Sequence, residues 1–308
     1  MKKYRSRAIV PLFLLPIYLL LLLTRLIPPS EVDTTVKLFF ALTVLELFIF
    51  ALPTFFFCKL RGQDYVRELS LEPFSPKSCG FLASIGFLVL SVGLLVNALF
   101  YFWGIGSASY TSLGSFILSE VSIDKNPLYV IFAYGAIPAL CEEFLFRGVL
   151  IAEYKKYSFT AAAIFSSFAY ALCYFDLAGL PFYFASGLLL AYTVRITGSV
   201  FAAMLTRFFI NVASIYLMPP LWQLLTQPLG ELFATFIAVA ILMVALTLVL
   251  FTAEKEYRRM ATDPRHADDR SFPKKLALRN TLKALSSPTF LICFGVYAVA
   301  VTVILVTK

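Results

Sequence analysis

The sequence is poor in charged residues: only 14% of its 308 residues are Asp, Glu, Lys or Arg, whereas 60% are hydrophobic. A typical soluble domain is about a quarter charged and about half apolar, so the composition excludes an ordinary soluble protein. Histidine is nearly absent, because His266 is the only one, and the five cysteines show no C-x-x-C spacing. The usual histidine or paired-cysteine zinc sites are therefore excluded, and we expect neither a metal nor a cofactor.

Long apolar stretches, in contrast, are abundant. A membrane-spanning helix needs about 20 mostly apolar residues. Nine stretches qualify, the fifth and sixth being short: 8–27, 36–58, 79–103, 127–148, 159–175, 180–194, 199–218, 232–252 and 288–307. The first is expected to be a retained signal-anchor helix. The sequence therefore predicts an all-α fold, a polytopic transmembrane bundle of about nine spans.

The distribution of positive charge predicts the orientation of this bundle. If the N-terminus is cytoplasmic, 21 of the 26 Lys and Arg residues fall inside and 5 outside, as the positive-inside rule requires. The C-terminus then lies outside, as does the long loop 104–126. The net charge of +8 is thus explained by topology and by contact with anionic lipid. Nucleic acid is not an expected partner, because no basic stripe interleaved with aromatic residues stands outside the spans.

Three regions are expected along the chain. Residues 1–74 form an N-terminal transmembrane hairpin with a cytoplasmic loop, residues 75–218 form the core, and residues 219–308 form C-terminal spans with a basic cytoplasmic loop. Within that loop Lys275, Arg279 and Lys283 recur at i, i+4 and i+8, and leucines at 278, 282 and 285 recur at i, i+4 and i+7. This pattern predicts a basic amphipathic helix that lies on an anionic leaflet. The alternative is a solvated charged loop.

The stretch "CEEFLFRG", Cys141 to Gly148, places charges at the end of an apolar run. On a helix Glu143 and Arg147 are i, i+4 neighbours that can pair. Glu142 is turned about 100° from Glu143, so it can face the interior of the bundle. The alternative is an interfacial cluster that simply ends a span.

Two other spans carry polar residues at helical spacing. Tyr170 and Tyr174 share one helix face, and Arg207 and Asn211 share another. An arginine in mid-span costs roughly 3 kcal/mol unless it is paired or reaches water, and such residues mark functional sites. We expect Arg207 to pair with one of the two glutamates of "CEEFLFRG". Snorkelling of Arg207, or a polar core that only fixes packing, is the alternative.

These motifs resemble those of the CPBP family, the CAAX-prenyl-protease and bacteriocin-processing (Abi) intramembrane proteases. The resemblance covers roughly residues 75–218. The first family motif, E-E-x-x-x-R, is intact at Glu142, Glu143 and Arg147. The second, F-x-x-x-H, has Tyr174 in place of histidine. The third, H-x-x-x-N, has Arg207 in place of histidine and retains Asn211.

The resemblance implies a family site in which the first glutamate activates a water for peptide hydrolysis, and the histidines and the asparagine complete the site. Some accounts of the family include a metal ion. Arginine stays protonated and offers no lone pair, and tyrosine is a poor base near neutral pH. The expected consequence is a closed ion-pair network at Glu142, in place of the ordinary mechanism.

We therefore expect a catalytically degenerate CPBP homologue that binds a membrane or peptide partner as a scaffold or regulator. One alternative is an active intramembrane glutamic endopeptidase that uses Glu142, with Tyr174 and Arg207 stabilising an oxyanion. Another is a transporter-like or lipid-binding bundle in which the buried charges line a pathway. The compact loops and the lack of a eukaryotic retention signal favour a bacterial plasma membrane.

Overall fold

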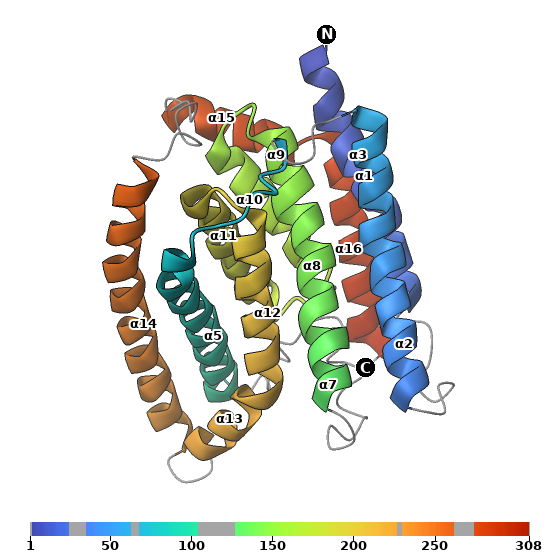
Figure 1. Ribbon diagram of the computed structural model, residues 1–308. Helices are drawn as coiled ribbons and strands as arrows, with labels where there is room; N and C mark the ends of the chain where they lie inside the picture. Colours follow the sequence, from blue (N-terminus) through green and yellow to red (C-terminus); the bar gives the residue numbers. More distant parts are fainter. Residues whose placement is uncertain are drawn as a thin grey trace.

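The computed structural model describes residues 2–24, 35–62, 68–103, 127–226, 230–261 and 274–307, and these residues form helices without a strand among them (Figure 1). The helices that build the bundle are α1 (Lys2–Thr24), α2 (Thr35–Glu46), α3 (Leu52–Arg61), α5 (Cys79–Phe102), α7 (Pro127–Val130), α8 (Ile137–Glu143), α9 (Ile151–Tyr154), α10 (Phe159–Leu172), α11 (Leu180–Thr197), α12 (Val200–Tyr216), α13 (Met218–Thr226), α14 (Gly230–Met260), α15 (Lys274–Leu285) and α16 (Pro288–Thr307). The predicted all-α fold class is confirmed.

Each of the nine apolar stretches expected to span a membrane falls on a helix. Among the described residues, five helices are long and apolar enough to cross a bilayer, or seven if two bent helix pairs each count as one span. Two further apolar helices, one within α1 and the other α10, have fewer than the 18 residues required of a candidate span. The chain is therefore an integral membrane protein, and the count of nine spans stays a prediction.

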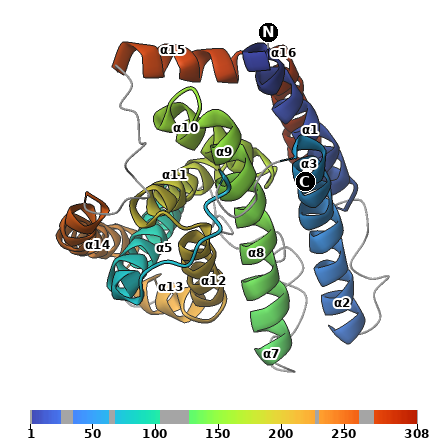
Figure 2. The same cartoon turned by 45° about the horizontal axis from the view of Figure 1, so that its top comes forward.

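The helices form one bundle, and the N- and C-termini of the chain lie at opposite ends of it (Figure 1). Helix α14 packs along α5 at one edge, and α1 packs against α16 at the other (Figure 2). Between these edges lie α8, α10, α11 and α12. Helix α12 packs against both α8 and α11, and α11 packs against α10. The three motifs described above lie on α8 and the turn that follows it, on α10 and the turn after it, and on α12.

Two long helices widen into π-helical turns just before a proline. The turn η2 (Leu47–Ala51) precedes Pro53, and the turn η5 (Ile131–Ala136) precedes Pro138. Proline lacks an N–H and crowds the carbonyl four residues earlier, so a wider turn removes the clash without breaking the helix. A third π-helical turn, η6 (Phe144–Leu150), follows α8 directly. Glu142 and Glu143 thus lie on a short α-helical piece between two π-helical turns.

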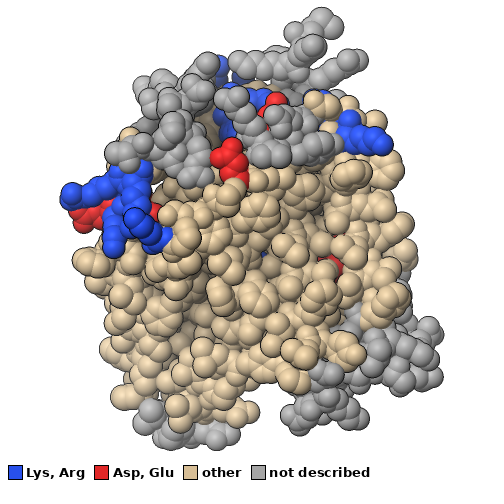
Figure 3. Space-filling view, viewed as in Figure 1, with Lys and Arg blue, Asp and Glu red and all other residues tan. Residues whose placement is uncertain are grey.

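Charge is concentrated at the end of the bundle that carries the N-terminus, and the broad middle of the visible face is largely uncharged (Figure 3). Two buried glutamates are anchored at this end. Glu153 on α9 binds Arg61 of α3 at 3.1 Å, and Glu256 on α14 accepts a hydrogen bond from Ser78 at 2.9 Å. Loop 104–126 and His266, both discussed above, lie outside the described residues.

Candidate active site

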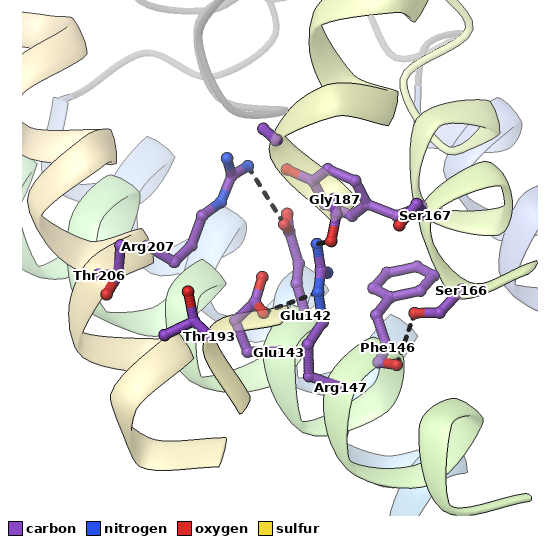
Figure 4. Close-up of polar contacts among 12 residues, drawn as sticks. Glu142, Glu143, Phe146, Arg147, Ser166, Ser167, Gly187, Thr193, Thr206 and Arg207 are labelled. Carbon is purple, nitrogen blue, oxygen red and sulfur yellow. Dashed lines mark hydrogen bonds and ion pairs between the residues drawn. The ribbon is translucent and has the colours of Figure 1, made fainter. Parts of the chain in front are cut away.

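The two glutamates of "CEEFLFRG" are buried at the end of α8, with exposed fractions of 1% for Glu142 and 0% for Glu143. Their carboxylates leave the helix in different directions, as the 100° offset requires (Figure 4). One faces Arg147 of its own helix and the other faces Arg207 across the bundle. The two carboxylates therefore have separate partners.

The predicted pair within the helix is confirmed. Arg147 Nε lies 3.1 Å from Glu143 Oε2, and neither side chain is accessible to solvent. The contact is an ion pair whose angles fall outside hydrogen-bond geometry. Arg147 Nη2 also donates to the carbonyl of Gly187 on α11, at 3.5 Å. Arg147 thereby ties α11 to the helix that carries the glutamates.

The predicted pair between helices is confirmed as well. Arg207 Nη2 donates to Glu142 Oε2 at 3.4 Å and to the hydroxyl of Tyr174 at 2.6 Å. The Tyr174 hydroxyl donates in turn to the same carboxylate oxygen at 3.1 Å. The three residues, from α8, α12 and the turn after α10, form a closed triangle around one oxygen of Glu142.

Tyr170 belongs to this cluster, although the sequence analysis did not assign it to the site. Its hydroxyl lies 2.8 Å from that of Tyr174, and it must be the donor because the single Tyr174 proton already goes to Glu142. Its ring lies 4.5 Å from the guanidinium of Arg147 and 5.2 Å from that of Arg207. Tyr170 thus lies close to two cations and attracts both through its ring. Its i, i+4 spacing to Tyr174 was the available sequence signal.

The tyrosines are themselves fixed by aromatic packing. The rings of Tyr174 and Tyr183 stack with centroids 3.8 Å apart and planes 2° apart, and Tyr170 meets Phe146 edge to face at 5.3 Å. Ser166 on α10 donates to the Phe146 carbonyl at 2.7 Å, which holds α10 against η6. The hydroxyls that contact Glu142 therefore stand on rigid supports.

Several polar atoms of the cluster are nevertheless buried without a hydrogen bond. They include Glu142 Oε1, both oxygens of Glu143, Arg147 Nη1 and Arg207 Nε. Buried polar groups are usually hydrogen-bonded, and exceptions often lie at functional sites. One oxygen of Glu142 is thus fully engaged, while the other is available to a ligand that can donate.

Asn211, the retained residue of the third motif, is buried but directed elsewhere. The contact described for its amide is donation to the Gly135 carbonyl of η5 at 3.4 Å. The wider π-helical turn leaves some backbone carbonyls with poor hydrogen-bond partners inside the helix. The Asn211 amide supplies a partner to one of them and so stabilises the turn. The structure therefore brings Glu142, Tyr174 and Arg207 together and connects Asn211 to the backbone of η5.

Glu46 is a third carboxylate near the cluster that the sequence analysis missed. It ends α2, which packs against α8, and it is 8% exposed. Its Oε2 atom is buried without a hydrogen bond. The signal was a lone carboxylate inside the apolar stretch 36–58, a position that is costly unless it is functional. Three carboxylates and two guanidinium groups thus share the interior of the bundle.

The arrangement supports electrostatic stabilisation better than metal chemistry. Among the residues that the structure describes, no group of three or more His, Cys, Asp and Glu side chains is close enough to hold a metal ion. The two guanidinium groups, whose Arg147 Nη1 and Arg207 Nε atoms have no hydrogen bond, are donors suited to an anion or an oxyanion.

Comparison with known proteins gives one family. Residues 124–213 match the family model described as Rce1-like, type II CAAX prenyl endopeptidase. Comparisons with curated proteins and with solved structures give no match. The matched segment runs from α7 to nearly the end of α12 and contains every residue of the buried cluster except Glu46. Through this segment the chain is similar to the CAAX-protease-like intramembrane endopeptidases of the CPBP family.

Proposed function

We propose that this CPBP-family protein is catalytically degenerate and binds a membrane or peptide partner as a scaffold or regulator. The observation that carries the proposal is the triangle around Glu142 Oε2, in which Arg207 donates at 3.4 Å and Tyr174 at 3.1 Å. Both residues stand where the family motifs have histidine. A permanently protonated arginine holds the carboxylate without exchanging a proton with it.

A glutamate that acts as general base must position a water, accept its proton and pass that proton to the leaving amine. Arg207 favours the ionised carboxylate and occupies one of its oxygens, which opposes the proton transfer that hydrolysis requires. The Tyr174 hydroxyl donates to Glu142 and accepts from the Tyr170 hydroxyl. Neither hydroxyl can therefore replace a histidine, which accepts and releases protons near neutral pH. The cluster is therefore suited to holding charge in place.

An active intramembrane glutamic endopeptidase is the second candidate, and one observation favours it. Glu142 Oε1 is buried without a hydrogen bond, so it could accept from a water, while Arg207 Nε is an unused donor for an oxyanion. In this mechanism Tyr174 and Arg207 stabilise the tetrahedral intermediate and Glu142 alone moves the proton.

Peptide cleavage by the purified protein in proteoliposomes separates the two candidates. The substrates are membrane-anchored peptides, with and without a prenyl group, and cleavage is read by mass spectrometry. We expect the wild type to show no activity above that of Glu142→Gln. Glu153→Gln is the matched control, because Glu153 is also 1% exposed but lies outside the cluster. Cleavage that is lost in Glu142→Gln and kept in Glu153→Gln would establish the active enzyme.

Restoring the histidines is the complementary experiment. The double variant Tyr174→His, Arg207→His returns both family motifs to their usual residues. If degeneracy rests on these two positions, this variant gains cleavage that a further Glu142→Gln change removes. Size-exclusion profiles in detergent report whether each variant remains folded.

We further propose that the protein lies in a bacterial plasma membrane with its N-terminus in the cytoplasm. The support is the charge split of 21 to 5, together with the gathering of Lys and Arg at the N-terminal end (Figure 3). Accessibility of single cysteines tests the orientation in a cysteine-free background. Ser109→Cys should react from outside and Ala267→Cys only from inside, and reversed labelling would overturn the orientation.

A further inference from the structure

Helix α15 lies across the end of the bundle near the N-terminus, crossing the direction of the spans (Figures 1 and 2). It leads into α16 through a bend of 60°. Because α16 is one of the apolar helices, the bend leaves α15 at the level where a span meets the membrane surface.

One face of α15 is docked on the protein. Asn280, Thr281 and Ala284 are buried, and the Asn280 amide donates to the carbonyl of Tyr157 at 2.9 Å. Tyr157 directly precedes Ser158, the N-cap of α10, whose hydroxyl accepts from Ala161 N at 3.0 Å. The helix is therefore attached to the start of the element that leads to Tyr170 and Tyr174.

The rest of the helix is exposed and is divided into two arcs. Leu278 and Leu282 are 63% and 56% exposed and lie 40° apart at 100° per residue. Arg279 and Lys283, both exposed, form a second pair about 100° further round. The protein-facing arc, the leucine arc and the cationic arc thus follow one another around the helix.

This order fits a helix at the rim of a membrane protein. A leucine arc beside the docked face can enter the acyl region, while the adjacent cations remain at the depth of the headgroups. The occupant must be apolar on one side and anionic on the other, which is the chemistry of an anionic phospholipid leaflet. Further cations at the same end, Lys155 and Lys156, are exposed and favour the same surface.

We propose that α15 is an interfacial anchor that inserts Leu278 and Leu282 into the leaflet and binds anionic phospholipid headgroups through Arg279 and Lys283. The predicted helix over this segment is confirmed. The side chain of Lys275, the first of the three cations expected to contact lipid, lies outside the described residues. The leucine expected to complete the apolar face, Leu285, is instead half-buried and packs against the core.

Hydrogen exchange of the full-length protein in nanodiscs tests the proposal. One disc contains phosphatidylcholine only, and the other contains phosphatidylcholine with phosphatidylglycerol. Because each cation near the surface contributes about 1 kcal/mol, two cations should raise the protection of amides 279–286 on the order of 30-fold in the anionic disc. The increase should shrink as salt is added.

Two variants separate the charge from the apolar contact. Arg279→Gln, Lys283→Gln should abolish the difference between the two discs, whereas Leu278→Ser, Leu282→Ser should lower protection in both. The matched control, Lys255→Gln, Arg258→Gln, removes two exposed cations from the end of α14 and should leave α15 unchanged. Equal protection in both discs for the wild type would overturn the proposal. So would protection that depends on having two copies per disc, since the face would then contact a second chain.

Discussion

This protein has two sets of buried glutamates, and their charges are compensated in different ways. In the interior, Glu142 and Arg207 are 1% and 2% exposed, and both charges are withdrawn from water. At the N-terminal end, Glu153 is equally buried, but its partners Arg61 and Lys156 reach solvent, with side-chain exposed fractions of 30% and 50%. Glu256 likewise binds Arg259, which is 33% exposed.

The difference indicates what each set is for. The Arg61–Glu153 pair connects α3 to α9, and the Glu256–Arg259 pair lies within α14. Both cost little, because one partner of each pair still reaches water. The interior pairs pay the desolvation of both partners and still leave oxygens and N–H groups without hydrogen bonds. Because burying both charges adds little to stability, we propose that the interior pairs belong to a functional site, past or present.

The largest expected effect is that of removing Arg207. Arg207→Ala leaves Glu142 without its buried cation and should lower the free energy of unfolding by about 3–5 kcal/mol. Adding Glu142→Gln should recover part of that loss, because the uncompensated charge is then gone. Chemical denaturation in detergent gives the double-mutant cycle, and additive losses would mean that the two groups do not interact.

The next effect is that of removing one hydroxyl. Tyr174→Phe deletes a group that accepts from Arg207 and donates to Glu142, bonds that involve charged partners, so a loss of about 1.5–3 kcal/mol is expected. Tyr170→Phe keeps the ring that faces both guanidinium groups and loses only a neutral bond, for about 0.5–1.5 kcal/mol. Chemical denaturation in detergent ranks the two variants by their free energy of unfolding. A larger loss of stability for Tyr170→Phe than for Tyr174→Phe would contradict the assignment of Tyr174 as the residue that bonds both charged groups.

Close packing beside the interior cluster gives a third expectation. A Cβ at Gly187 would lie 2.9 Å from Ser167 Cβ and 3.0 Å from its Cα, so α10 and α11 must move apart in Gly187→Ala. We expect a destabilisation of about 1–3 kcal/mol. Gly295→Ala is the matched control, since nothing lies within 4 Å of a Cβ there, and it should stabilise α16 by up to about 1 kcal/mol. Equal melting shifts for the two variants would refute the packing argument.

The smallest effect is expected at the exposed end. Arg61→Ala breaks the 3.1 Å pair with Glu153, yet Lys156 remains 3.4 Å from the same oxygen and water is accessible. The loss should be about 0–1 kcal/mol, several-fold below that of Arg207→Ala. A loss as large as that of Arg207→Ala would remove the distinction between the two sets of glutamates.

By itself the sequence determined the all-α membrane class, because uninterrupted apolar stretches of about 20 residues have few other solutions. It also determined the Glu143–Arg147 pair, since i, i+4 neighbours on one helix meet whatever the rest of the chain does. The family was readable from the intact "EEFLFR" motif and its spacing to Tyr174, Arg207 and Asn211.

Only the tertiary structure decided which glutamate Arg207 binds, that Tyr170 lies close to two cations, and that Glu46 is buried on a helix packed against α8. These contacts depend on how helices far apart in sequence are rotated and set against one another. Helical periodicity fixes the face on which a side chain stands, but not the neighbour that the face meets. The same reason applies to α15, where the repeat predicted an amphipathic helix and only packing showed that Asn280 and Ala284 dock while Leu278 and Leu282 remain exposed.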